Sequence, residues 1–150
     1  MYKNEFDNYL KQNKKFKAYM FYGQSIFLVE QYALVIAQSL GNDDEIEKLY
    51  FEEYDFKYTK DKLLQSSLFS SNNIILIKID KKIPKKEVDS LIEACNLNPD
   101  STLIFACLGD SDFKTMEASF SLKTNSAAVR FFLPTDTEAI KFLEYEAKMQ

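Results

Sequence analysis

Apolar runs separated by short polar turns divide the chain into alternating strands and helices. The runs at residues 74–79 and 102–108 are almost entirely apolar, which is typical of strands buried on both faces. Further runs predict strands over residues 18–22, 48–52 and 127–132. Strands that alternate with helices predict an α/β fold: a five-stranded parallel sheet with helices on both faces, built from right-handed crossovers.

Helices are predicted between these strands by periodic apolar positions and by residues that favour helix ends. Thr59 is a candidate N-cap, and Pro84 suits the first turn of a helix because its missing N–H is not needed there. The predicted helices span residues 1–17, 25–40, 59–65 and 84–96, with another from residue 113 to about 122.

The end of the sequence carries the start signal of one more helix. Residues 135–138 form a good N-terminal capping run, and no stop signal follows before Gln150. We therefore expect one domain over residues 1–135 and the truncated start of a following domain over residues 136–150.

The composition indicates a globular domain that is not a basic nucleic-acid reader. The chain has 150 residues, of which 46% are hydrophobic and 28% charged, enough for a substantial core. A formal net charge of −4 and a pI near 5.0 argue against strong autonomous binding to nucleic acid, which depends on clustered Lys and Arg. Arg130 is the only arginine. We expect any contact with DNA to be weak or indirect.

Residue types that support catalysis and metal binding are scarce. The sequence contains no His, the side chain most often used for proton transfer and metal ligation. Cys95 and Cys107 lack the spacing of a metal site, so we predict buried free thiols. We expect no cofactor and no metal. The first residues lack a secretory signal and no run reaches the length of a membrane span, so a cytoplasmic location is predicted.

Parallel α/β folds place their sites at the carboxyl ends of the strands, so any catalytic or binding motif is expected there. Residues 22–27 occupy the position of a phosphate-binding P-loop, but only Gly23 remains of that motif and its lysine is missing. Asp80 ends a strand as a Walker B acid does, yet Lys81 follows it, so we predict a solvated aspartate. Asp110 and Asp112 are predicted to cap the next helix.

A dense set of lysines follows the third predicted strand and could contact DNA phosphates. No aromatic residue is interleaved with them to stack on bases and no arginine is present, so a solvated edge is the favoured interpretation. The set consists of Lys78, Lys81, Lys82, Lys85 and Lys86.

The stretch Gln65–Phe69 places an apolar pair, Leu68 and Phe69, at the junction between a short helix and a polar turn. Such a pair is either part of the core or a hydrophobic plug for a partner protein. The sequence pattern alone leaves both alternatives open.

The order of these segments resembles the N-terminal domain of the delta subunit of bacterial DNA polymerase III, a clamp-loader subunit that opens the sliding clamp. The opening strand, Gly23 and the helix up to Glu30 look like the start of that family. Ser67-Leu68-Phe69 before an Ile-rich strand resembles its clamp-contact segment. The similarity continues through residues 84–106 and into Phe131-Phe132-Leu133-Pro134, which resembles the passage into a second domain.

The resemblance implies an AAA+ or P-loop NTPase-like fold without nucleotide binding. It also implies that the domain binds the beta sliding clamp through a short element and opens the ring for loading onto primed DNA. The implied clamp-binding residues are Gln65, Ser67, Leu68 and Phe69, with a possible contact rim at Lys62, Leu64, Ser70 and Asn72. Ser66 departs from the usual apolar second residue of the clamp-binding pentapeptide.

The implied partners are the beta clamp and, through domains not included in this sequence, the delta-prime and ATPase subunits. The chain would then be a non-catalytic part of a DNA-directed DNA polymerase, a nucleotidyltransferase, although the sequence leaves its own activity uncertain. One alternative is an enzyme with a degenerate P-loop. Another is a different clamp-loader subunit, which would carry zinc-binding cysteines or a GKT loop, and this sequence has neither.

Overall fold

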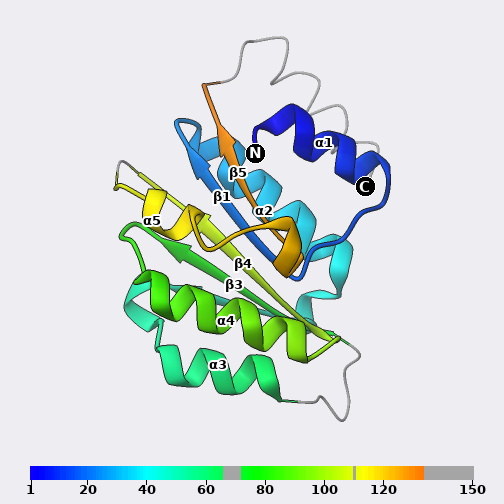
Figure 1. Ribbon diagram of the computed structural model, residues 1–150, viewed down its shortest axis with the longest axis vertical. Helices are drawn as coiled ribbons and strands as arrows, with labels where there is room; N and C mark the ends of the chain where they lie inside the picture. The colour runs from blue at the N-terminus through cyan, green and yellow to red at the C-terminus, as the bar shows by residue number, and fades with distance from the viewer. Residues whose placement is uncertain (66–71, 110, 134–150) are drawn as a thin grey trace.

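The computed structural model describes residues 1–65, 72–109 and 111–133, and its centre is a parallel five-stranded sheet (Figure 1). The strands lie in the order β2-β3-β4-β1-β5, and each neighbouring pair is parallel. Their bounds are β1 Ala18–Gly23, β2 Ile46–Tyr50, β3 Asn73–Ile79, β4 Ser101–Cys107 and β5 Ser126–Phe131. The predicted α/β fold class is confirmed.

The helices cover both faces of this sheet. Helices α1 and α2 pack on one face, and α3, α4 and α5 pack on the other (Figure 1). Their bounds are α1 Lys3–Lys11, α2 Ile26–Leu40, α3 Phe56–Leu64, α4 Lys85–Leu97 and α5 Lys114–Glu117. Short 3-10 turns add η1 Asp43–Glu45, η2 Phe51–Glu53 and η3 Leu122–Thr124.

Alternating side chains of the strands build two separate cores. On β1, Met20 faces the layer of α3 and α4, whereas Tyr19 and Phe21 face the layer of α1 and α2. All seven residues of β4 are buried, as expected for the central strand of a sheet covered on both sides. Aromatic packing dominates the second core, where the ring of Phe6 on α1 lies 5.4 Å from that of Phe21.

Several predicted element boundaries are wrong, among them the first helix, which spans only Lys3–Lys11 and not residues 1–17. The second strand ends at Tyr50 and not at residue 52, because residues 51–53 form the turn η2. Helix α3 begins three residues earlier than predicted, and its N-cap is Asp55, whose side chain accepts the N–H of Tyr58. Thr59 is instead fully buried inside the helix, where its hydroxyl donates to the Asp55 carbonyl at 2.8 Å.

The helix predicted from residue 113 to about 122 is also wrong. Only α5 is helical, and the chain then turns through η3 to Asn125, which has a positive φ of 53°. Buried Phe113 and Met116 fix α5 to the core. Asp112 accepts the N–H of Lys114 and so satisfies a donor at the helix start, as predicted, whereas Asp110 lies outside the described residues.

The two thiols are buried, as predicted for Cys95 and Cys107. Burial raises the pKa of the Cys95 thiol to about 12, and it also raises the pKa of Cys107. Burial therefore favours the protonated form of both thiols. Across the three described segments of the chain, no helix is both long and apolar enough to cross a membrane.

Candidate functional site

The stretch that the sequence singles out connects α3 to β3 at the edge of the sheet where the strands begin. We call this the amino edge. Gln65 follows α3 and is exposed, and Asn72 precedes β3. Ser66–Ser71, and with them Ser67, Leu68, Phe69 and Ser70, lie outside the described residues. The candidate site is therefore built from the residues that flank this connection.

Three polar side chains hold the end of α3 from outside the helix. The Ser101 hydroxyl donates to the Leu63 carbonyl at 2.6 Å, and the Asn98 amide donates to the same carbonyl at 2.9 Å. The Asn98 amide also reaches the Gln65 carbonyl at 3.1 Å. From β3, the Asn73 amide donates to the Lys62 carbonyl at 2.6 Å. We call Asn73, Asn98 and Ser101 the amino-edge clasp.

The clasp supplies what the end of the helix lacks. The last carbonyls of an α-helix have no N–H partner within the helix and need one from elsewhere. In this chain the partners come from β3, from β4 and from the turn between α4 and β4. The position at which α3 ends is therefore set by tertiary contacts.

The other end of the connection is held separately. The backbone N–H of Asn72 donates to one carboxylate oxygen of Glu45 at 3.0 Å, and the N–H of Asn42 donates to the other at 2.9 Å. The N–H of Asn73 donates to the Asp100 carbonyl at 2.8 Å. Both ends of the connection are thus anchored to neighbouring elements.

The predicted rim residues differ in how available they are. The Leu64 side chain is 41% exposed, whereas that of the preceding residue, Leu63, is fully buried. The Lys62 ammonium lies 3.9 Å from a carboxylate oxygen of Glu47 and is held toward β2. Leu64 and Gln65 therefore form the open surface beside the connection, whereas Lys62 and Asn72 have contacts within the domain.

The opposite edge of the sheet, where the strands end, does not form a phosphate cradle. We call it the carboxyl edge. Gly23 runs so close to β5 that a Cβ atom would lie 2.1 Å from the Phe131 carbonyl oxygen. The N–H of Gln24 donates to that same carbonyl at 2.9 Å, and the Ser25 hydroxyl accepts the N–H of Leu28 at 3.2 Å. These groups close the turn onto β5 and cap α2, so they are not directed at a bound anion. Asp80 is exposed, as predicted.

The predicted lysine set lies at the carboxyl edge, and acidic side chains lie beside two of its members. The Lys78 ammonium is 3.9 Å from Glu30, and the Lys85 ammonium is 2.9 Å from Asp89. Contrary to the expectation from sequence, an aromatic ring lies beside the set. The Lys78 ammonium is 6.0 Å from the centre of the Tyr50 ring. The ring comes from β2, 28 positions earlier, and the parallel pairing of β2 with β3 brings it there. Because Glu30 and Asp89 partly neutralise Lys78 and Lys85, a solvated edge remains the favoured interpretation over a DNA contact.

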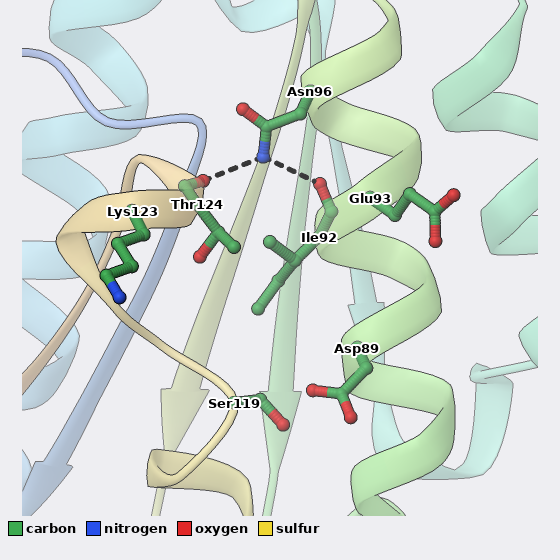
Figure 2. A pocket seen from close by; sticks show the side chains of 7 residues that line it. All are labelled: Asp89, Ile92, Glu93, Asn96, Ser119, Lys123 and Thr124. Carbon is green, nitrogen blue, oxygen red and sulfur yellow. Dashed lines mark hydrogen bonds between the residues drawn. The ribbon is translucent and has the colours of Figure 1, made fainter.

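A cavity of about 500 Å³ lies between α4 and the segment that leads into η3 (Figure 2). The Asn96 amide at its rim donates to the Ile92 carbonyl at 3.1 Å and to the Thr124 carbonyl at 2.7 Å. The Ser119 hydroxyl and the Lys85 ammonium lower the pKa of the Asp89 carboxyl.

In residues 1–65, 72–109 and 111–133, no three His, Cys, Asp or Glu side chains are grouped to hold a metal ion.

Comparison with known proteins decides the family. Residues 19–132 match the family described as "DNA polymerase III, delta subunit", which is more than half of the chain. The chain belongs to the DNA polymerase III delta subunit family. The matched range begins one residue into β1 and runs past the end of β5.

Two curated relatives of this delta-family chain come from strains of Helicobacter pylori. They are 28% and 26% identical to it, and each match covers 98% of this chain. The same matches cover 48% of each relative, so the chain spans about half the length of the curated relatives it matches.

A solved structure supports the fold of the delta-family chain. The crystal structure of a DNA polymerase III gamma subunit-related protein from Thermotoga maritima superposes with a TM-score of 0.53. The match covers 89% of this chain and 47% of that one, at 7% sequence identity. At this identity the likeness shows the fold alone, and it supports the α/β fold described above.

Proposed function

We propose that this chain is the clamp-binding domain of a DNA polymerase III delta subunit. It binds the beta sliding clamp through Leu68 and Phe69, with Gln65 and Ser67 completing the contact. Family membership supports this proposal, and so does the position of the connection between two fixed ends. The observation that carries it is the exposed flank, where Leu64 and Gln65 face solvent at the amino edge.

The energetics of two apolar anchors require a wider contact surface. Burying a Leu or Phe side chain gains about 1.5 to 3 kcal/mol. Association costs about 4 to 15 kcal/mol in lost freedom of motion, so the pair is not sufficient alone. The exposed Leu64 and Gln65, with Ser70, are the nearest residues to add area. Lys62 and Asn72 add to the rim with the parts of their side chains that remain accessible.

Ring opening follows if the domain binds one clamp conformation better than another. A ligand shifts a conformational equilibrium only by the difference between its affinities for the two states. We propose that the bound domain favours a clamp edge whose shape is incompatible with the closed ring. The ring can then be loaded onto primed DNA.

The remaining parts of the proposal concern domains and partners. Residues 1–135 form the N-terminal domain, and residues 136–150 begin the following lid domain. The half of the relatives' length that this chain does not span would join the delta-prime and ATPase subunits of the loader. The domain itself is non-catalytic, acts in the cytoplasm and contacts DNA weakly or indirectly.

The direct test replaces Leu68 and Phe69 together by Ala and measures affinity for the beta clamp of the same organism by calorimetry. Losing two anchors of about 1.5 kcal/mol each weakens binding by about 100-fold. The matched control replaces Phe132 and Leu133 by Ala, because these side chains are 51% and 70% exposed and follow the end of β5, at the opposite edge of the sheet. Unchanged affinity of the Leu68 and Phe69 variant contradicts the proposal.

A further inference from the structure

Three leucines are exposed along the amino edge, at the ends of three different elements. Leu64 is the last residue of α3, Leu97 is the last of α4, and Leu122 is the first of η3. Leu97 is 70% exposed and Leu122 is 59% exposed, both more than Leu64. The strands β4 and β5 begin a few positions after Leu97 and Leu122, which places both residues at the edge where the strands begin. We call these three side chains the leucine face.

The end of α3 is joined to the end of α4 by hydrogen bonds. The amide of Asn98, the residue after Leu97, donates to the carbonyls of Leu63 and Gln65, which lie on either side of Leu64. The two helices lie side by side (Figure 1). Leu64 and Leu97 therefore belong to the same part of the amino edge.

The end of α4 is joined in the same way to η3. The amide of Asn96, the residue before Leu97, donates at 2.7 Å to the carbonyl of Thr124, which is in the same turn as Leu122. Leu97 is thus the central member of the leucine face, with a bonded neighbour on each side.

The packing of α4 against the sheet does not account for Leu97. The buried residues of the helix are Val88, Leu91, Ile92, Ala94 and Cys95. Leu97 follows them at the end of the helix and lies outside the core. A single exposed leucine is ordinary on a protein surface, whereas apolar side chains that gather at one place indicate a contact surface.

Large apolar side chains are also exposed at the carboxyl edge, but rings there have partners within the domain. The ring of Phe132 lies 5.5 Å from that of Tyr2 and 5.4 Å from the Arg130 guanidinium. A leucine side chain has no polar atom and no ring, so only burial against another apolar surface stabilises it.

We propose that the leucine face is a further contact of this domain with the beta sliding clamp, beside the Leu68 and Phe69 pair. This inference rests on the proposed function. A buried aromatic side chain covers about 150 to 250 Å², whereas stable protein–protein interfaces bury about 1,200 to 2,000 Å². Two anchors therefore need a neighbouring surface. Because Gln65, the first residue of the proposed contact, is bonded to Asn98, a clamp that contacts Gln65 also lies beside Leu97.

The test replaces Leu97 and Leu122 together by Ala in the 150-residue chain and measures affinity for the beta clamp of the same organism by calorimetry. We expect the affinity to fall about tenfold, less than for the central pair, because contacts around an anchor contribute less than the anchor itself. Leu97→Glu should weaken binding further, because it brings an unpaired carboxylate into an apolar contact. Both positions are exposed in the free domain, so the midpoint of urea unfolding should not move in either variant.

The matched control is Phe132→Ala with Leu133→Ala, which removes two exposed apolar side chains at the carboxyl edge and should leave the affinity unchanged. Unchanged affinity of the Leu97 and Leu122 variant, or an equal loss in the control, overturns the inference. Sedimentation of the chain alone tests a second copy as the occupant: dimers of the wild type that the Leu97 and Leu122 variant does not form would also overturn it.

Failure of the proposed function is seen separately. Clamp binding that survives Leu68→Ala with Phe69→Ala but weakens on replacing Leu97 and Leu122 contradicts the proposed anchor pair and supports the leucine face. The reverse pattern supports the anchor pair and overturns the leucine face. A wild-type chain that does not bind the clamp removes both.

Discussion

Gly23 is the residue at which β1 comes closest to β5. Its φ of +129° is unfavourable for any side chain, and a Cβ atom would lie 2.7 Å from the Phe131 nitrogen as well as 2.1 Å from its oxygen. Those atoms belong to a strand and cannot move aside without breaking the pairing of Gly23 with Phe131. This glycine is required by packing in the sheet.

We predict that Gly23→Ala lowers the free energy of unfolding by about 3 kcal/mol or more, in the range of the most damaging substitutions. Gly109→Ala is the control. Gly109 also has a positive φ, of +98°, but a Cβ atom there meets nothing within 4 Å. Its cost should stay near the backbone strain alone, about 1 to 2 kcal/mol. Urea denaturation measures both, and equal costs would refute the role of the β5 contact.

Individual polar residues were harder to predict from sequence than apolar ones. Asn98 and Ser101 belong to a run that signals only a turn, and nothing local indicates that they bind α3 more than thirty positions earlier. The contact between the Tyr50 ring and the Lys78 ammonium was not predicted for the same reason, because it depends on the pairing of β2 with β3. A parallel sheet brings together residues that are far apart in sequence.

At the scale of elements, Ser25 shows that a side chain of the protein, and not a bound phosphate, satisfies an N–H group at the start of α2. Its hydroxyl accepts the N–H of Leu28 and it is 4% exposed, so it acts as the N-cap of α2. The exposed Ile26 and Phe27 follow directly.

We predict that Ser25→Ala lowers the free energy of unfolding by about 1 kcal/mol, the usual cost of a lost N-cap. The same difference should be found with and without Mg²⁺ and ATP, because we expect neither protein to bind them at this turn. Ser25→Thr keeps the acceptor and should recover most of the loss. A rise in the unfolding temperature of the wild type on adding Mg²⁺ and ATP would instead support the degenerate P-loop alternative.

Elements with a strong hydrophobic pattern were predicted well, and those fixed by tertiary contacts were not. The apolar runs at β3 and β4 gave strands close to their true bounds. The helix expected from residue 113 was mostly wrong, since Phe113 and Met116 anchor α5 and the chain then turns away to reach β5. The start of α3 was misplaced because Asp55, and not Thr59, caps it.

At the scale of the whole molecule, the two edges of the sheet differ in structure. The carboxyl edge, where sites in such folds are normally found, is closed by Gly23 and Gln24 against β5. The amino edge carries the clasp and the exposed end of α3. The stretch at residues 65–69 was indicated by resemblance alone, and the structure places its first residue, Gln65, at the amino edge, opposite the usual site.

The most direct test of the account is hydrogen–deuterium exchange of the chain with and without the beta clamp. We predict that the clamp slows exchange in peptides covering residues 60–73, at the end of α3 and the start of β3. Peptides covering residues 23–27 and 107–113, at the carboxyl edge, should exchange as before. Protection at the carboxyl edge with no change at residues 60–73 would contradict the proposal that this domain holds the clamp by its amino edge.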